Sequence, residues 1–144
     1  MAEENGPEDC PIERAMRIIG SRTSMLVIRE AFTGVSRFDD FTAALGVSPA
    51  TVTAKLNALV DAGILKRQAY REPGSRTRQE YVLDEAGLEL APIVLGLYQW
   101  GRRHAGGRSP RRALHEACGE EVDVGMRCSG GHDVGCDELD IRKA

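Results

Sequence analysis

The stretch Arg37–Leu83, RFDDFTAALGVSPATVTAKLNALVDAGILKRQAYREPGSRTRQEYVL, decides the fold of this chain. It begins with a short amphipathic segment that ends near Leu45-Gly46, and a second helical segment follows from Ser48 to Ala62. Ser48 is a favoured N-cap, the proline after it suits the first helical turn, and the glycine after Ala62 favours a left-handed stop. Two helices joined by so short a turn predict a helix-turn-helix.

The second of these helices has one apolar side and one side of small or polar residues. The apolar stripe, with the spacing i, i+4, i+7 and i+8, consists of Val52, Leu56, Leu59 and Val60. The opposite and N-terminal surface consists of Ala50, Thr51, Ala54, Lys55 and Asn57. Because this surface has no bulky side chain, it fits the major groove of DNA.

After Gly63 the spacing of the apolar residues changes from that of a helix to that of a strand. Ile64–Tyr70 and Gln79–Leu83 flank a turn with Pro73-Gly74, which predicts a β-ribbon. The cations on and beside this turn are Arg71, Arg76 and Arg78. Crowded cations are unfavourable unless an anion neutralises them, and DNA phosphates are the usual partner of a wing beside a recognition helix. Taken alone, the same pattern is also typical of a solvated hairpin.

The charge of the chain is unevenly distributed. Of its 144 residues, 42% are hydrophobic and 28% are charged, which is ordinary for one soluble domain, and the formal net charge is −3. Residues 1–10 carry four acids and no base, whereas residues 11–105 carry 13 Lys and Arg against 10 Asp and Glu. The mildly basic body agrees with a DNA-binding core.

Several classes of function are disfavoured by what the sequence lacks. No stretch has the length of a transmembrane helix and residues 1–9 lack a signal pattern, so we expect a cytoplasmic protein with no membrane partner. There is no Gly-rich phosphate loop, His-Glu-x-x-His or Gly-x-Ser-x-Gly motif. We therefore do not expect an enzyme.

Two helices are predicted before the helix-turn-helix. The first begins at Cys10-Pro11 and breaks at Gly20-Ser21, and the second begins at Thr23 or Ser24 and ends at Thr33-Gly34. The buried residues expected in the second are Met25, Leu26, Ile28, Ala31 and Phe32. These helices are expected to support the helix-turn-helix.

A long helical pattern returns after the ribbon, with Asp84 as its N-cap and Pro92 expected to kink or divide it. Its apolar residues cover almost the whole circumference. One small domain cannot bury such a helix, so we expect a second copy of the chain to cover its outer face. The alternative is a helix at the centre of one domain.

The expected fold is mainly α with a small β-wing, a winged helix-turn-helix whose terminal helices form a homodimer. We expect an acidic N-terminal arm (1–9), a winged-helix domain (10–105) with a dimerisation helix (84–104), and a linker with a Cys- and His-containing tail (106–144).

The chain resembles the HxlR-type regulators, which are MarR-like winged helix-turn-helix transcription factors. The resemblance covers about residues 10–104 and is carried by Cys10-Pro11, Gly20, Leu26-Val27-Ile28-Arg29-Glu30, Gly34, Arg37-Phe38-Asp39-Asp40-Phe41, Leu45-Gly46-Val47-Ser48, the run from Leu56 to Leu65, Tyr70, Glu80-Tyr81-Val82-Leu83 and Trp100-Gly101. It implies a homodimeric bacterial regulator, often a repressor, that binds an operator through a recognition helix at Ser48–Ala62.

The resemblance also singles out Cys10, because some members of the family sense quinones, aldehydes or other electrophiles through the cysteine before the proline. A helix N-terminus favours a thiolate, but Glu8, Asp9 and Glu13 oppose it. A sensor and a packing cysteine at the dimer interface both remain open. The chain departs from the family where the second helix starts: a Trp usually follows the Gly-basic pair there, whereas this chain has Gly20-Ser21-Arg22-Thr23.

The tail resembles an appendix that has the pattern His-x-x-Cys-Gly followed by Cys-x-x-Cys-Gly. His115, Cys118 and Cys128 match it, but Gly131 stands where the next cysteine would be. Zinc through Cys118, Cys128, Cys136 and either His115 or His132 is one interpretation, and a flexible tail without metal is the other. No other cofactor is indicated.

The roles expected on DNA follow from the helix pair and the basic ribbon. We expect Thr51, Lys55 and Asn57 to contact base edges, with Ser48 and Ala50 near the backbone or a thymine methyl group. The residues expected to contact phosphates or the adjacent minor groove are Arg37, Arg71, Arg76 and Arg78. Two alternatives remain: a winged helix that docks another protein without touching DNA, and a DNA-binding dimer whose input is a small apolar ligand between its helices.

Overall fold

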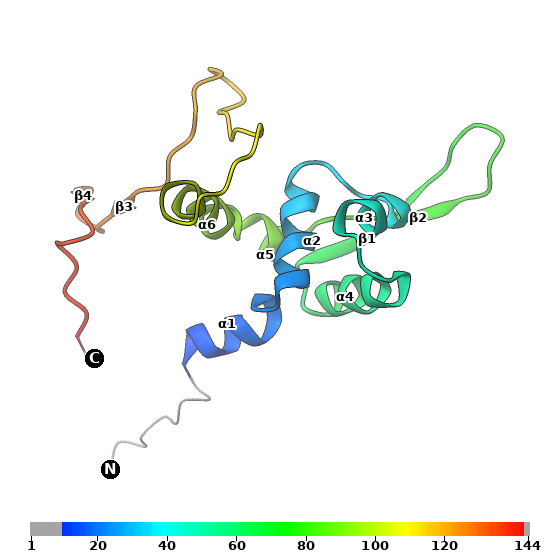
Figure 1. The fold of residues 1–144 in the computed structure, drawn as a ribbon, viewed down its shortest axis with the longest axis horizontal. Coiled ribbons are helices and arrows are strands. Elements are labelled where there is room, and N and C mark those ends of the chain that lie inside the picture. Colours follow the sequence, from blue (N-terminus) through cyan, green and yellow to red (C-terminus); the bar gives the residue numbers. More distant parts are fainter. Residues whose placement is uncertain (1–9, 143–144) are drawn as a thin grey trace, which may run out of the picture. The chain divides into compact units, whose positions relative to one another are not determined.

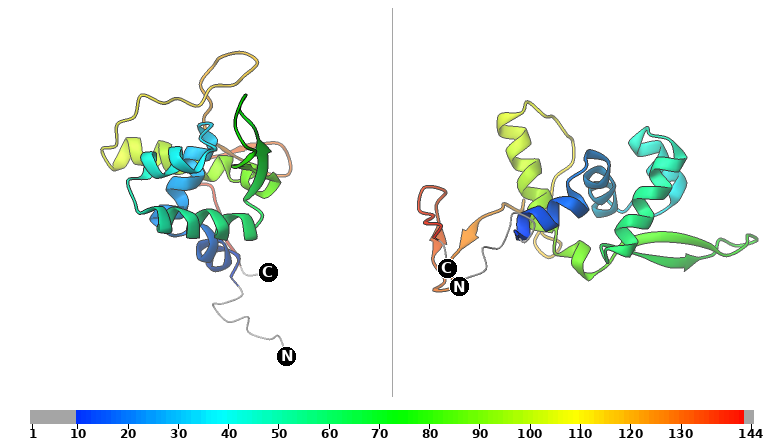
Figure 2. Two further views of the ribbon diagram at one scale, coloured as in Figure 1. Left: turned by 90° about the vertical axis from the view of Figure 1, so that its right-hand side faces the viewer. Right: turned by 90° about the horizontal axis from the view of Figure 1, so that it is seen from below.

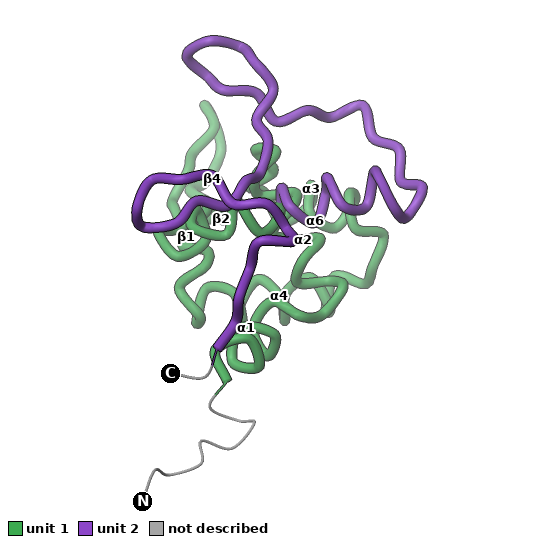
Figure 3. The backbone as a smooth tube through the Cα atoms, turned by 90° about the vertical axis from the view of Figure 1, so that its left-hand side faces the viewer, with its two compact units in different colours: residues 1–94 green, residues 95–144 purple. Residues whose placement is uncertain are grey.

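A computed structural model describes residues 10–142 (Figure 1). The chain divides into two compact units, Met1–Val94 and Leu95–Ala144, which are distinguished in Figure 3. The acidic arm predicted at 1–9 lies outside the described residues.

Two helices open the first unit. Helix α1 spans Pro11–Ile19 and α2 spans Arg22–Phe32. Helix α2 begins slightly earlier than predicted because Ser21 is its N-cap: the backbone N–H of Ser24 donates a 3.1 Å hydrogen bond to the Ser21 hydroxyl. The predicted break between the helices is confirmed.

The helix pair predicted from the sequence is confirmed as α3 (Phe38–Leu45) and α4 (Pro49–Asp61). The backbone N–H of Thr51 donates to the Ser48 hydroxyl at 3.2 Å, so Ser48 is the N-cap. Gly63, with φ +75°, turns the chain out of α4 in the left-handed region, as predicted.

A two-stranded antiparallel ribbon follows, formed by β1 (Leu65–Tyr70) and β2 (Arg78–Leu83). Leu65 pairs with Leu83 at its base and Tyr70 pairs with Arg78 near its tip. Figure 1 shows the ribbon projecting beyond α3 and α4 as a wing, and the right-hand view of Figure 2 agrees. The predicted β-wing is confirmed.

The helical pattern after the wing divides into α5 (Glu85–Leu88) and α6 (Ala91–His104). The Asp84 carboxylate accepts a 2.9 Å hydrogen bond from the N–H of Glu85, which confirms it as the N-cap. Pro92 lies in the first turn of α6, where its missing N–H costs no helical hydrogen bond, so the pattern divides rather than kinks.

The core of the first unit joins the helices to the base of the wing. Its fully buried side chains are Ile19, Val27, Ile28, Phe41, Val52, Leu56, Leu59, Ile64 and Leu65. In α2 only Ile28 of the predicted set is fully buried, and Met25, Leu26, Ala31 and Phe32 are half-buried. Val27 takes the central place instead, because α2 packs against both α3 and α4 and so buries a wider face than the prediction assumed.

Helix α2 also buries a carboxylate that the sequence analysis did not identify. Glu30 is 2% exposed. Arg29 donates to its Oε1 from Nε at 2.9 Å and from Nη2 at 2.5 Å. Burying a carboxylate is unfavourable unless it is paired and hydrogen-bonded, and this pairing meets that requirement.

The second unit contains most of α6 and the tail. Leu114 and Glu121 form an isolated antiparallel bridge, and β3 (Met126–Arg127) pairs with β4 (Asp133–Val134). Gln99 of α6 holds the intervening segment: its Nε2 donates to the carbonyl of Val122 at 3.0 Å, and its Oε1 accepts from the N–H of Val124 at 3.2 Å. Within residues 10–142, no helix has the length and apolar character needed to cross a membrane.

Gly87 provides a test of the packing of α5 against the base of the wing, where Ile64 precedes β1. A β-carbon on Gly87 would lie 2.1 Å from the carbonyl oxygen of Ile64, a backbone atom that cannot move away freely. We expect Gly87→Ala to lower the free energy of unfolding by about 1–3 kcal/mol, measured by urea denaturation. Gly125→Ala is the control, because its β-carbon meets nothing within 4 Å. Equal stability of the two variants would contradict the packing described.

Candidate nucleic-acid interface

Helix α4 is seated by its apolar stripe and presents its other face to solvent. Val52, Leu56 and Leu59 are fully buried, and each such side chain contributes roughly 1.5–3 kcal/mol on burial. The predicted contact residues lie on the other side: Ser48, Ala50, Ala54 and Asn57 are exposed, and Thr51 and Lys55 are half-buried. The structure therefore brings the predicted α4 residues together on one accessible surface.

Thr51 is already engaged at the start of α4. Its backbone N–H donates to the Ser48 hydroxyl, and the two hydroxyl oxygens lie 2.8 Å apart. This pairing fixes the side chains of Ser48 and Thr51 at the first turn, where the positive end of the helix dipole lies. One hydroxyl hydrogen lies between the two oxygens, so the hydrogen of the other hydroxyl can point to a phosphate or a base acceptor.

Asn57 is joined to the wing by a cation that the sequence analysis did not include. The Arg67 Nη2 donates a 2.6 Å hydrogen bond to Asn57 Oδ1, and the Arg67 guanidinium lies 5.9 Å from the centre of the Tyr81 ring. Arg67 is on β1, the strand that packs beside α4. The sequence shows only that Arg67 is a cation on the first strand of the ribbon. The packing of α4 against β1 shows that Arg67 reaches the exposed face of α4.

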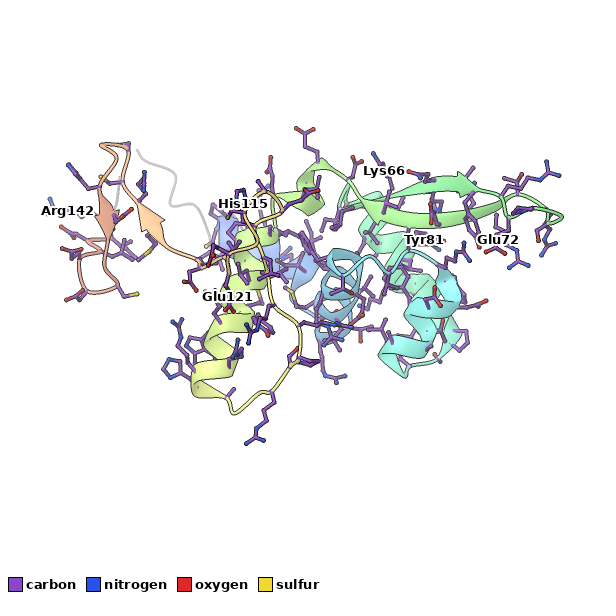
Figure 4. The ribbon with its side chains drawn as sticks, turned by 90° about the horizontal axis from the view of Figure 1, so that it is seen from above. Lys66, Glu72, Tyr81, His115, Glu121 and Arg142 are labelled. Atoms are coloured by element: carbon purple, nitrogen blue, oxygen red, sulfur yellow. The ribbon has the colours of Figure 1, made fainter. Side chains whose placement is uncertain are left out.

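The tip of the wing carries the three predicted arginines. Nε of Arg71 donates to the carbonyl of Ser75 at 2.9 Å, which stiffens the turn. Arg76 and Arg78 are exposed, and neither pairs with a carboxylate in the described part of the chain. In Figure 4 the labelled Glu72 lies toward the tip of the ribbon and Lys66 toward its base. The cations at the tip are therefore available to an anion.

Arg37 differs from the other predicted phosphate ligands because it is held within the protein. Its Nη1, at the start of α3, pairs with Oε1 of Glu72 on the wing, and its guanidinium lies 4.4 Å from the centre of the Tyr70 ring. The hydrogen bond that Arg37 donates to Glu72 raises the pKa of Arg37 above its usual value, so the side chain is cationic at all working pH values. Glu72 therefore competes with any phosphate for Arg37.

A second set of contacts fixes the wing to the loop before α3. The N–H of Tyr81 donates to the carbonyl of Ser36 at 2.7 Å, and the Ser36 hydroxyl donates to Oε2 of Glu80 at 2.7 Å. With the Arg37 ion pair, these bonds set the direction of the ribbon relative to the helix pair. The recognition surface thus consists of α4 and the wing, which these contacts hold in a fixed position relative to each other.

The other predicted site residues lie away from this surface in the sequence. Cys10 is the N-cap residue of α1 and is exposed. In the tail, His115 Nδ1 lies 3.0 Å from Cys118 Sγ, and His132 Nδ1 lies 3.6 Å from Cys128 Sγ. The backbone N–H of His132, and next that of Gly130, lower the pKa of the Cys128 thiol.

The predicted zinc ligands are not gathered around one point. Across residues 10–142, no group of three or more His, Cys, Asp or Glu side chains is placed to hold a metal ion. The structure brings together His115 with Cys118 and Cys128 with His132. Within the described residues, Cys136 makes no hydrogen bond with His115 or His132.

Two linked helices followed by an antiparallel ribbon define a winged helix-turn-helix. A family model for HxlR-like helix-turn-helix proteins matches residues 18–108. Rv3095 of Mycobacterium tuberculosis, which is named an HTH-type transcriptional regulator, is 34% identical over 120 residues, or 82% of this chain and 75% of that protein. This chain belongs to the HxlR-like helix-turn-helix family, and it is a transcriptional regulator with a helix-turn-helix DNA-binding fold.

Solved structures agree with this assignment. PA1607, described as a candidate transcription factor, is 28% identical with a TM-score of 0.79, and the match covers 96% of this chain and 97% of that chain. The reduced form of the redox regulator HypR is 28% identical with a TM-score of 0.60, covering 67% of this chain and 94% of that chain. The family consists of regulators rather than enzymes.

The ion pair at the wing generates a prediction about affinity. Glu72→Gln removes the carboxylate that competes for Arg37, so binding to an arbitrary DNA duplex should tighten by about two- to five-fold at low salt. Fluorescence anisotropy with a labelled duplex measures this change. Glu89→Gln, which removes one negative charge at the end of α5, is the matched control. An equal gain in both variants would mean that net charge, not release of Arg37, controls affinity.

Proposed function

We infer that the protein is a homodimeric repressor that acts in the cytoplasm on a pseudo-palindromic operator. The observation that carries this proposal is the single surface formed by the exposed face of α4 and the uncompensated arginines of the wing, Arg76 and Arg78. In a symmetric dimer, two copies of α4 would enter successive major grooves roughly 34–36 Å apart.

Different side chains of this surface would do different work. Lys55, Asn57 and Thr51 would contact base edges, while Ser48 and Ala50 lie at the helix start, close to the backbone or a thymine methyl group. Arg71, Arg76 and Arg78 would meet phosphates or the minor groove. Arg67 is added to this set, because it holds the Asn57 amide oxygen and so leaves the Asn57 NH₂ group free to point toward DNA.

The proposed dimer is supported by apolar side chains that each unit leaves in solvent. On α1, Ile12 is 73% exposed and Met16 is 52% exposed. On α6, Leu97 and Trp100 are 52% and 58% exposed. Large apolar side chains clustered on a helix face mark an association surface, and a second copy of the chain is the partner that a palindromic operator requires.

Two substitutions test DNA recognition. Arg76→Ala should weaken binding to all duplexes and flatten the dependence of log K on log salt by about one unit, because one phosphate contact is lost. Asn57→Ala should instead relax the preference at one base pair per half-site. The readout is competition binding to the chain's own upstream region and to single-base variants.

Arg17→Ala is the control for this experiment, because it removes the same charge from α1, which Figure 1 places at the opposite end of the first unit from the wing. Arg17→Ala should leave the salt slope unchanged. If Arg76→Ala also leaves it unchanged, the wing does not contact DNA. If Asn57→Ala weakens all sequences equally, Asn57 contacts only the backbone.

The principal alternative is a winged helix that binds another protein. The uncompensated arginines at the wing tip favour DNA. Retention on heparin or nonspecific DNA at low salt separates the two, since a protein-docking module lacking a phosphate surface would not be retained. No DNA binding at any salt concentration would favour this alternative.

Cys10 is the proposed input of the regulator, through oxidants or electrophiles. It is exposed at the start of α1, beside the apolar residues proposed to form the dimer, and HypR, to which this chain is similar, is a redox regulator. Modification of a thiol at this position would change how two copies of α1 pack. A small apolar ligand held between the dimer helices is the alternative input.

Substitution of Cys10 separates these inputs. In a gel shift on the upstream region, diamide or a quinone should release the wild-type protein reversibly, with recovery on adding a reductant. Cys10→Ser should bind DNA normally but should not be released by the oxidant. Cys136→Ser is the control, because it removes an exposed thiol from the tail and should remain sensitive. Release of Cys10→Ser by diamide would exclude Cys10 as the sensor.

A further inference from the structure

Two cysteine–histidine pairs lie in the tail of the second unit and have no role in the proposed recognition of DNA. One pair is His115 with Cys118, and the other is Cys128 with His132. All four side chains are exposed. Imidazole nitrogen and thiolate sulfur are the ligands that structural zinc prefers.

The distances within the pairs suit a tetrahedral zinc ion. Zn–S bonds of about 2.3 Å and Zn–N bonds of about 2.0–2.1 Å place neighbouring sulfur and nitrogen ligands roughly 3.5 Å apart. The 3.6 Å between Cys128 Sγ and His132 Nδ1 already has this value. The 3.0 Å between His115 Nδ1 and Cys118 Sγ needs to widen by roughly half an ångström, which a small side-chain rotation provides.

The backbone holds both pairs in place. The N–H of Gly119 donates to the carbonyl of His115 at 2.7 Å, which closes a turn around Cys118. The N–H of Cys128 donates to the carbonyl of His132 at 2.9 Å, which closes the β3–β4 hairpin behind the second pair. Both turns pass through a glycine in the left-handed region, Gly119 at φ +75° and Gly131 at φ +86°. Each pair of ligands is therefore already arranged as half of a metal site, or half-site.

The tail has almost no core that could hold these turns by itself. In residues 106–142 only Ala113 and Val134 are even half-buried, and β3 and β4 have two residues each. Segments that bury so little apolar surface are usually stabilised by disulfides, metals or association. All four cysteines are free, so no disulfide holds these turns, and a metal is a means of stabilisation that their side chains can bind.

The two half-sites do not meet within one chain. The segment between them is held by the Leu114–Glu121 bridge and by the hydrogen bonds between Gln99 and residues 122–124. In Figure 4 the labelled His115 stands apart from the β3–β4 hairpin. The described residues accordingly contain no group of three ligands at one point.

We propose that two copies of this chain share zinc, with His115 and Cys118 of one chain and Cys128 and His132 of its partner completing each tetrahedral site. A twofold axis makes this exchange reciprocal, so a dimer would hold two identical ions with no donor left over. Both cysteines bind as thiolates, and their two protons are released to solvent. The inference rests on the homodimer of the proposed function and adds a metal bridge to it.

The first test is metal content. The purified full chain, reconstituted with zinc and desalted, should hold about one zinc per chain by elemental analysis. Cys118→Ser and Cys128→Ser should each lose the metal. Cys136→Ser should retain it, because Cys136 belongs to neither pair. Absence of zinc from the wild-type dimer, or loss from Cys136→Ser equal to that of the others, would overturn the donor set.

The second test asks which chain supplies each ligand. Cys118→Ser and Cys128→Ser chains with different affinity tags are coexpressed, and the mixed dimer is purified through both tags. Shared sites predict about one zinc per mixed dimer, since the first chain keeps Cys128 and His132 while the second keeps His115 and Cys118. Sites confined to one chain predict none, because every chain then lacks a ligand.

Light scattering on the same samples distinguishes failure of this inference from failure of the proposed function. A monomeric wild-type protein would refute the homodimer and the shared site together. A wild-type dimer that binds DNA but holds no zinc, or whose mixed form holds none, would refute only the shared site. Because each variant in the mixed dimer carries one damaged pair, recovered zinc also shows that both chains remain folded.

Discussion

The seating of α4 in the core is the constraint on which the rest of the molecule depends. Val52, Leu56 and Leu59 are buried against the same cluster as Ile28 and Phe41, and Leu65 at the base of β1 completes it. Because one stripe of α4 is fixed in this way, its opposite face must point outward, and the first residues of the wing must leave the core beside it. Hydrophobic burial thus orients a surface whose own residues contribute little to stability.

Electrostatic contacts then set how that surface is presented. Arg67 holds the amide oxygen of Asn57, and Glu72 holds Arg37 against the ring of Tyr70. Such exposed pairs add little to stability, but they decide which cations are free to meet an anion. Arg37 is paired with Glu72, whereas Arg76 and Arg78 near the wing tip are left without a carboxylate partner in the described part of the chain. This division suits a protein whose overall charge is negative and whose contact with DNA must be local.

The tail and the winged helix differ in what stabilises them. The first unit folds around a continuous apolar core, and the second has short turns, few buried side chains and exposed apolar residues along α6. The turns bring cysteine and histidine together without a core to support them. The match to PA1607 extends over 96% of this chain, so a tail of comparable length accompanies the winged helix in another protein.

The sequence by itself determined the helix-turn-helix, the wing and the family, because capping residues, apolar period and turn residues act over a few neighbouring positions. Ser48, Gly63 and Asp84 each function where local rules place them. Only the tertiary structure decided that Val27 and Glu30 are buried and that Arg67 reaches Asn57. Those contacts depend on which elements pack together, and no spacing along the chain specifies the distance between side chains on different elements.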